Sequence, residues 1–315
     1  IIENIDIGGP TLVRAAAKNY NDVTVITDAK YYKNLINELN SNKGFTSLDF
    51  RKEMSEIAFT ETAYYDSVIS NYFSINSKKI FKEKKIIYGK LLKELRYGEN
   101  PHQKAILYSK DNDIGLNQLN GKELSYNNYG DIFSSLLISK SLPKNVGTVI
   151  VKHSNPCGVS VNRDHKKSYN LALSSDPISA FGGVVCCNFK INLSIAKELY
   201  KSFYEVVIGN GIEKKALKIL KKRKNLRVID SSKLNINYLE SIIFNNNNFL
   251  VQNTDNIKFP LNNFKVVSKR KPSAKMMNNL ISTFNICRFV KSNGIVISNG
   301  DSTIGIGSGQ PSRLD

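Results

Sequence analysis

The sequence predicts an α/β protein with two domains. Its 315 residues are more than one ordinary hydrophobic core accommodates. From Ile86 onward, short β-branched runs alternate with longer runs of helical periodicity, as in layered α/β folds. A polar, lysine-rich stretch without apolar period precedes this region. We therefore expect one domain in residues 1–75, a linker in 76–90 and a second domain in 91–315.

The first 75 residues read as the end of an α/β domain. A proline in a first turn followed by alanines predicts a helix that begins near Pro10. Val23–Thr27 predicts a short β-branched strand. Helices are expected over about 30–40 and from Thr46 to about Tyr72, the second with an apolar stripe that predicts core packing.

The second region has the alternation that favours a largely parallel or mixed sheet covered by helices. Strands are expected at 104–108, 146–152, 183–189, 204–208, 226–230 and 294–298, and helices at 131–141, 165–174, 192–202, 212–222 and 275–291. The four asparagines of 245–248 predict a turn, because Asn tolerates positive φ.

The strongly basic charge balance raises the question of a nucleic-acid partner. A net charge of +18 is compatible with binding to phosphate backbones. Most of the cations are lysines scattered among Asn and Ile, and no stretch interleaves aromatic residues with arginine as single-strand binders do. The composition therefore favours attraction of small anionic substrates over a nucleic-acid role.

Compartment follows from hydropathy and cysteine usage. No apolar run approaches the roughly 20 residues that span a bilayer, and no signal-peptide pattern opens the sequence. The four cysteines form no C-x-x-C pair, and the adjacent Cys186 and Cys187 point to opposite faces of any strand that carries them. We expect no disulfide framework and a cytoplasmic protein.

The strongest candidate for chemistry is the sequence VIVKHSNPCG, from Val149 to Gly158. A buried strand is expected to end at Lys152 and His153, followed by a turn of Asn, Pro and Gly, as α/β enzymes present catalytic groups at the carboxyl ends of strands. The ammonium disfavours imidazolium, so His153 can accept a proton while Lys152 stabilises a developing anion. A solvated lysine and a turn-capping histidine are the alternative interpretation.

A zinc site at the same residues is not expected. Zinc deaminases need H-x-E and P-C-x-x-C, whereas His153 is followed by Ser-Asn and Cys157 by Gly-Val-Ser. Cys157 is expected to be a packed small residue and not a nucleophile.

Three further stretches could contact a ligand. Leu95–Gln103, with the sequence LRYGENPHQ, offers a phosphate clamp and directional hydrogen bonds in a loop. The glycine pair that ends Asp176–Gly183 lets backbone approach a ligand closely. Thr303–Gln310 has G-x-G-x-G spacing without a clear following helix, so it supports a dinucleotide fingerprint only weakly.

Together these segments resemble the bifunctional purine-biosynthesis family that joins IMP cyclohydrolase to AICAR transformylase (phosphoribosylaminoimidazolecarboxamide formyltransferase). The resemblance covers essentially the whole chain. The motifs that carry it are KHSNPCG (152–158), LRYGENPHQ (95–103), GKELSYNN (121–128), the Ser179–Gly183 turn, Ile304–Arg313, and IDIGGP (5–10) with AAAKN (15–19).

The resemblance implies formyl transfer from 10-formyltetrahydrofolate to the 5-amino group of AICAR, giving FAICAR, at an active site shared across a homodimer. It implies His153 as the general base and Lys152 as the group that stabilises the tetrahedral oxyanion, with no metal in the chemistry. Further substrate contacts are implied for Arg96, Tyr97, His102, Phe181, Gly182, Glu205, Asn299 and Arg313.

For fold, the resemblance implies the end of a methylglyoxal-synthase-like α/β domain, then a cytidine-deaminase-like α/β/α transformylase domain without zinc. Asp6 and Ile7 match positions that bind IMP, and Lys18 matches a catalytic proton-shuttling position. The family has further segments at both ends, so we expect a chain truncated at both ends, with an incomplete cyclohydrolase half and part of the transformylase domain missing. A basic nucleic-acid-binding protein on this scaffold, or an inactive fragment, are the alternatives.

Overall fold

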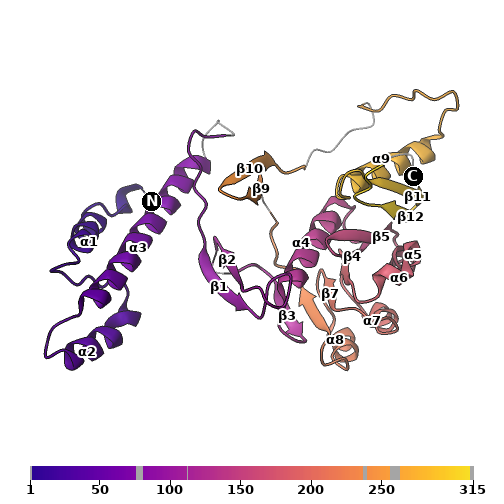
Figure 1. Ribbon diagram of the computed structural model, residues 1–315. Coiled ribbons are helices and arrows are strands. Elements are labelled where there is room, and N and C mark those ends of the chain that lie inside the picture. Colours follow the sequence, from indigo (N-terminus) through magenta and orange to yellow (C-terminus); the bar gives the residue numbers. More distant parts are fainter. Residues whose placement is uncertain (1, 76–80, 112, 237–239, 256–262, 313–315) are drawn as a thin grey trace. The chain divides into compact units, whose positions relative to one another are not determined.

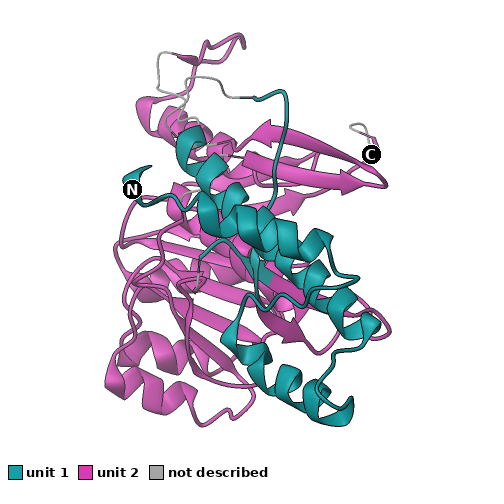
Figure 2. Ribbon diagram, turned by 90° about the vertical axis from the view of Figure 1, so that its left-hand side faces the viewer, with its two compact units in different colours: residues 1–91, 108–112 teal, residues 92–107, 113–315 magenta. Residues whose placement is uncertain are grey.

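The computed structural model describes residues 2–75, 81–111, 113–236, 240–255 and 263–312 (Figure 1). The chain forms two compact units, one of residues 1–91 with 108–112 and the other of residues 92–107 with 113–315 (Figure 2). The functional domains expected at 1–75 and 91–315 remain a prediction, because compactness alone does not define them.

The first unit is mostly helical in its described part. The helices are α1 (Gly8–Lys18), α2 (Tyr32–Ser41) and α3 (Leu48–Ile75), with short 3-10 turns at Ile2–Asn4 and Ala29–Tyr31. All three helices were predicted. Helices α1 and α3 pack through the buried Ala17, Met54 and Ala58, and the Ser55 hydroxyl donates to the Ala17 carbonyl (2.7 Å).

The strand predicted at 23–27 is wrong. This segment has no strand beside it in the described part of the chain, so its backbone groups cannot form a ladder. The Val23 N–H instead donates to the Asn19 carbonyl (2.9 Å), and the Thr24 and Thr46 hydroxyls bond to each other (2.8 Å).

Two small two-stranded sheets accompany the main sheet. Strands β1 (Lys90–Leu95) and β2 (Ala105–Ser109) form one of them, and β9 (Glu240–Asn245) and β10 (Asn248–Asn253) form the other. Asn246 lies in the β9–β10 turn at φ +53°, which confirms the turn predicted from the asparagine tract.

The second unit is organised around an eight-stranded mixed sheet in the order β11-β12-β5-β4-β6-β7-β8-β3. Strands β6, β7 and β8 are parallel, and the other pairs are antiparallel. The strands are β3 (Asn117–Asn120), β4 (Gly147–Lys152), β5 (Asn155–Val161), β6 (Val184–Cys187), β7 (Val206–Gly209), β8 (Arg227–Asp230), β11 (Ile295–Asn299) and β12 (Ser302–Gly307). This confirms a mixed sheet, although the sequence did not predict three of its strands, β3, β5 and β12.

Helices cover both faces of this sheet. They are α4 (Tyr126–Ser141), α5 (His165–Ser175), α6 (Pro177–Ala180), α7 (Leu193–Leu199), α8 (Lys214–Leu220) and α9 (Ala274–Cys287). Helices α5 to α8 pack on one face, and α4 and α9 on the other. Strand residues alternate between the two cores, so Cys187 lies with α5 to α8 while Cys186 faces α4, as predicted.

No helix in the described residues is both long enough and apolar enough to cross a membrane.

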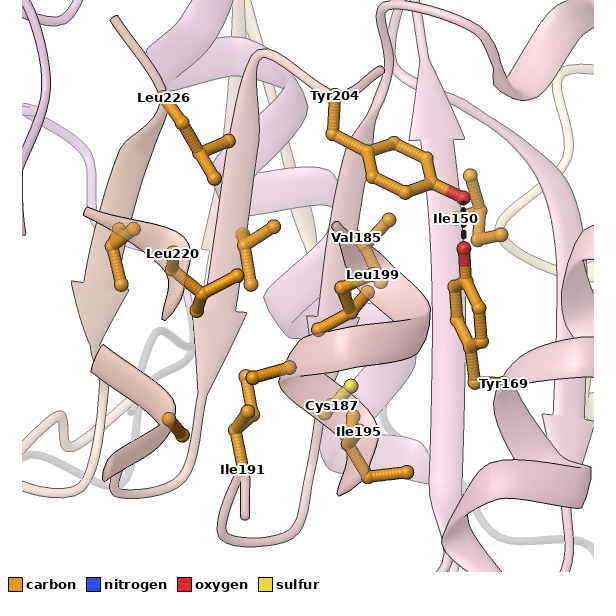
Figure 3. Close-up of a cluster of buried hydrophobic side chains, with 14 of the residues drawn as sticks. Ile150, Tyr169, Val185, Cys187, Ile191, Ile195, Leu199, Tyr204, Leu220 and Leu226 are labelled. Atoms are coloured by element: carbon orange, nitrogen blue, oxygen red, sulfur yellow. Dashed lines mark hydrogen bonds between the residues drawn. The ribbon is translucent and has the colours of Figure 1, made fainter. Parts of the chain in front are cut away.

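One core contains a buried pair of tyrosines (Figure 3). Tyr169 of α5 and Tyr204, just before β7, are 1% and 2% exposed, and their hydroxyls lie 2.9 Å apart. Burial raises the pKa of both phenols, so both stay protonated and one donates to the other. This bond links α5 to the parallel part of the sheet.

Replacing Tyr204 by Phe should lower the free energy of unfolding of the second unit by roughly 1–3 kcal/mol, because the Tyr169 hydroxyl loses its short partner in a buried site. The Tyr169→Phe/Tyr204→Phe double variant should be closer to wild type, because no buried hydroxyl is left unpaired. Urea unfolding measures both values. A harmless single substitution, or a double variant with additive losses, would contradict this.

Candidate active site

The predicted catalytic pair lies at a tight hairpin between β4 and β5. Lys152 pairs with Asn155, so His153 and Ser154 alone form the turn, at φ +52° and +60°. Two-residue hairpin turns with both central residues left-handed favour Asn-Gly. For other residues the left-handed conformation costs roughly 1–2 kcal/mol each. The backbone conformation of this turn is therefore unfavourable by itself and must be stabilised by its surroundings.

The turn predicted at Asn155, Pro156 and Gly158 is wrong, because these residues already belong to β5. The register shifts there, with Ile150 opposite Gly158 and Val151 opposite Pro156, so Cys157 is the extra residue of a β-bulge. A bulge tolerates a proline that donates no ladder hydrogen bond.

The pair lies at a different edge of the sheet from the carboxyl edge that the sequence predicts. Strand β4 is antiparallel to both neighbours, β5 and β6, so Lys152 does not lie at the carboxyl edge of a parallel sheet. It lies where β6, β7 and β8 begin, since Val151 is opposite Val184, which is level with Val206 and Arg227. Residues that enter these three parallel strands therefore share one edge with the pair.

Backbone bonds connect the residues at this edge. The Gly182 N–H donates to the Phe203 carbonyl (2.9 Å), and the Glu205 N–H to the Gly183 carbonyl (3.1 Å). The Lys152 ammonium donates to the Phe181 carbonyl (2.8 Å), which fixes the head of its side chain beside the entry to β6. The structure thus brings together four predicted residues: Lys152, Phe181, Gly182 and Glu205.

Gly182 and Phe181 present backbone and an aromatic ring at this edge. Gly182 has φ +75°, a conformation that glycine adopts freely. Phe181 is 62% exposed, and its ring centroid lies 5.1 Å from that of Phe203. An exposed aromatic surface beside a lysine suits a planar, anionic ligand.

A carboxylate missed by the sequence analysis supports the turn. Asp131 of α4 accepts the Ser154 N–H at 2.6 Å. Burial raises the pKa of Asp131, and the backbone N–H groups of Ser154 and His153 oppose that shift. From the other side, the Asn155 amide donates to the His153 carbonyl (3.0 Å) and accepts from the Ser308 hydroxyl (2.6 Å).

A second missed residue, Arg227, accompanies Glu205. The Glu205 carboxylate accepts from the Asn128 amide (2.8 Å) and lies 3.5 Å from the Arg227 guanidinium. Arg227 is 8% exposed, and its Nε donates to the Glu123 carbonyl (3.1 Å). Burial lowers the pKa of Arg227 and the Glu205 carboxylate raises it, so the ion pair holds the guanidinium charged.

The Leu95–Gln103 loop is a structured turn between β1 and β2. The Gly98 N–H donates to the Gln103 carbonyl (2.8 Å), and the Asn100 N–H to the Gln103 side chain (2.7 Å). The Asn127 amide of α4 donates to the Glu99 carbonyl (3.2 Å), which ties the loop to helix α4 within the second unit.

This loop also places predicted ligand-binding groups. The Arg96 guanidinium lies 5.5 Å from the centroid of the Tyr97 ring, and both groups influence the pKa of Arg227, the first residue of β8. His102 is exposed in the same loop. An exposed guanidinium on an aromatic face remains available to a phosphate.

Other predicted residues lie elsewhere. Asn299 ends β11 and pairs with Ser302, which is opposite Ser160 near the far end of β5 from His153. The glycine motif at 303–310 runs mostly through β12 and does not form a loop that opens a helix. Arg313 lies outside the described residues.

Asp6, Ile7 and Lys18 belong to the first unit. Asp6 precedes α1, where its carboxylate accepts the Gly9 N–H (2.9 Å) and its own N–H donates to the Tyr65 hydroxyl (2.9 Å). Ile7 is exposed, and Lys18 is an exposed residue at the other end of α1. The hydrogen bonds thus fix Asp6, while the Lys18 ammonium stays accessible.

Cys157 is a partly buried free cysteine that packs against one of the two cores. Burial raises the pKa of the Cys157 thiol to about 11, and the Asp176 carboxylate adds to this. Such a thiol is a poor nucleophile near neutral pH.

Across the described part of the chain, no group of three or more His, Cys, Asp or Glu side chains could hold a metal ion.

The family model and the individual proteins that match this chain all belong to the same family. Residues 16–315 match the family described as AICARFT/IMPCHase bienzyme. The chain is similar to the bifunctional purine biosynthesis protein PurH of Bradyrhizobium diazoefficiens (40% identity over 322 residues, 100% of this chain and 61% of that protein). It is also similar to the PurH proteins of Rhizobium rhizogenes (39% over 322 residues, 100% and 60%) and Buchnera aphidicola subsp. Schizaphis graminum (41% over 331 residues, 100% and 62%). The chain thus spans about three-fifths of the length of these relatives.

The Cys157 thiol should react slowly with iodoacetamide at pH 8, because a pKa of about 11 leaves roughly one thiolate in a thousand at that pH. Its rate should rise about tenfold per pH unit from pH 7 to 9. Mass spectrometry of the peptide that contains Cys157 measures this. Labelling at pH 8 as fast as that of a free thiol would contradict the packed-residue interpretation.

Proposed function

Because the chain belongs to the AICARFT/IMPCHase bienzyme family, we propose that its second unit carries the site that transfers a formyl group from 10-formyltetrahydrofolate to the 5-amino group of AICAR, giving FAICAR. The observation that carries this proposal is the turn that presents the Lys152 ammonium and the His153 imidazole together at the edge where β6, β7 and β8 begin. An amine acceptor needs a base, and a formyl carbonyl needs a cation, at adjacent positions.

The first step assigns one role to each member of the pair. The AICAR amine attacks the formyl carbon and forms a C–N bond, while the exposed His153 imidazole takes the proton that the amine loses. The carbonyl electrons move to oxygen, and the Lys152 ammonium stabilises the resulting oxyanion. Its bond to the Phe181 carbonyl holds the ammonium in place before the charge develops.

The second step breaks the bond between the formyl carbon and the folate nitrogen. The tetrahedral intermediate collapses, the formyl group stays on the AICAR nitrogen, and the folate nitrogen leaves with a proton. The imidazolium formed in the first step supplies that proton, and Lys152 assists departure. No metal enters this scheme, and 10-formyltetrahydrofolate is a cosubstrate.

Binding of the two substrates is assigned around the pair. Arg96 and Tyr97 would hold the AICAR phosphate and ring, with His102 near the reacting groups and Gly182 and Phe181 against AICAR. On the folate side, Glu205 matches a contact position, and its bonds to Asn128 and Arg227 support that role by fixing its carboxylate. Arg313 is the other proposed folate contact.

The proposed assembly is a homodimer with a shared active site. Asn299 is assigned to AICAR, yet it pairs with strand residues near the opposite end of β5 from His153. A contribution of Asn299 from a second copy of the chain reconciles its role with its position. The fold proposed for this unit is the cytidine-deaminase-like α/β/α arrangement, which the packing of helices on both faces of the mixed sheet supports.

The first unit is proposed to be the end of a methylglyoxal-synthase-like IMP cyclohydrolase domain, which converts FAICAR to IMP. Asp6 and Ile7 would bind IMP, and Lys18 would shuttle a proton. In this proposal the chain holds only part of the cyclohydrolase site, and the protein works in the last steps of purine biosynthesis in the cytoplasm.

Formyl transfer by the full-length protein should fall roughly 100-fold or more in kcat when His153 is replaced by Asn. Asn tolerates the left-handed conformation, so the turn persists while the base is lost. The transfer is followed by the absorbance of released tetrahydrofolate. Near-normal turnover would contradict the assignment.

His165→Asn is the matched control. The His165 ring stacks on Phe189 (3.8 Å between centroids), and its Nε2 lies 2.8 Å from the Asn145 carbonyl oxygen. Its loss should lower stability and leave kcat close to wild type. Saturable binding of random DNA without AICAR or folate binding would instead favour the nucleic-acid alternative.

A further inference from the structure

We propose that Asp131 is a positioning residue that holds the His153–Ser154 turn in its left-handed conformation and so aims the catalytic imidazole. This inference rests on the formyl-transfer function proposed above and adds a residue to it. Asp131 lies on α4, outside the hairpin, and need not touch substrate.

The conformation of the turn requires an external partner. Both His153 and Ser154 have positive φ, and neither side chain provides the freedom that glycine or asparagine brings to such turns. A residue that adopts this conformation against its own preference is held by its surroundings. The most direct support is the bond from the Ser154 N–H to the Asp131 carboxylate, at 2.6 Å.

The carboxylate faces both amides of the turn. The Ser154 N–H donates to the carboxylate at 2.6 Å, and the His153 N–H also lowers the pKa of Asp131 against the rise that burial causes. Consecutive N–H groups in a turn form such an anion-binding concavity, and here a side chain of the protein occupies it. Bonds of this kind to an ionised acceptor are stronger than those between neutral groups.

The two ends of the turn are anchored to different parts of the second unit. Asp131 fixes the N–H side from α4, while Asn155, backed by Ser308, fixes the His153 carbonyl. Asn155 belongs to the hairpin itself and moves with it. Asp131 is therefore the group that relates the turn to the helix layer, and with it the direction of the His153 side chain.

The test is a double-mutant cycle in the full-length protein. Asp131→Ala should lower kcat for formyl transfer at least roughly tenfold, because the turn relaxes from its left-handed form. KM should change less than kcat, because the substrate-binding residues remain. Adding Ser154→Gly should restore most of the lost kcat, since glycine adopts positive φ without help.

Asp164→Ala is the matched control, because Asp164 also accepts backbone N–H groups, those of Lys166 and Lys167 at the start of α5. It should lower stability slightly and leave kcat unchanged. Unchanged kcat in Asp131→Ala would overturn the proposal. So would a loss of kcat that Ser154→Gly does not restore, because the carboxylate would then act on substrate or on the fold as a whole.

A readout independent of activity separates this inference from the proposed function. If the wild-type protein transfers no formyl group, the proposed function fails, but hydrogen exchange of the peptide that contains Ser154 still reports on the turn. Faster exchange in Asp131→Ala than in wild type and Asp164→Ala supports the positioning role. Equal exchange in all three overturns it.

Discussion

The antiparallel placement of β4 between β5 and β6 is the constraint on which the candidate site depends. Had β4 run parallel to β6, Lys152 would lie at the edge where the parallel strands end. Its reversed direction carries Lys152 to the edge where β6, β7 and β8 begin. There the chain enters β6 through Phe181 and Gly182 and β7 through Glu205, and one edge collects groups far apart in sequence.

The second consequence of this arrangement is a conflict between local preference and tertiary structure. A hairpin that connects β4 directly to β5 leaves two residues for the turn, and both must be left-handed. The sequence supplies His and Ser there, at a cost of roughly 1–2 kcal/mol for each. The bond from the Ser154 N–H to the Asp131 carboxylate, at 2.6 Å, offsets part of that cost. Departures from local rules concentrate at functional sites, which agrees with a catalytic role for His153.

Prediction from sequence succeeded where local signals and tertiary structure agree. The β-branched runs of β4, β6, β7 and β8 and the helical periodicity of α4, α5, α7, α8 and α9 identified the core of the second unit, whereas the short helix α6 was not predicted. It failed at β5, whose Asn155, Pro156 and Gly158 are typical of turns, and at β12, which contains two glycines. It also failed at 23–27, where a β-branched run has no neighbouring strand among the described residues.

Some residues of the candidate site could be predicted from local sequence signals, and others could not. Lys152 and His153 stand out because a strand ends at two chemically active side chains. Asp131 and Arg227 carry no such local signal, and their importance depends on which strand ends meet at one edge. The direction of β4 decides that, and it follows from pairing across the whole sheet.

The most direct test of the central claim is the structure of the full-length protein with AICAR and a non-reactive folate analogue bound. The account predicts the AICAR amine about 2.6–3.2 Å from an imidazole nitrogen of His153, with the Lys152 ammonium facing the position of the formyl oxygen. AICAR bound at another edge of the sheet, or with its amine turned away from His153, would contradict it.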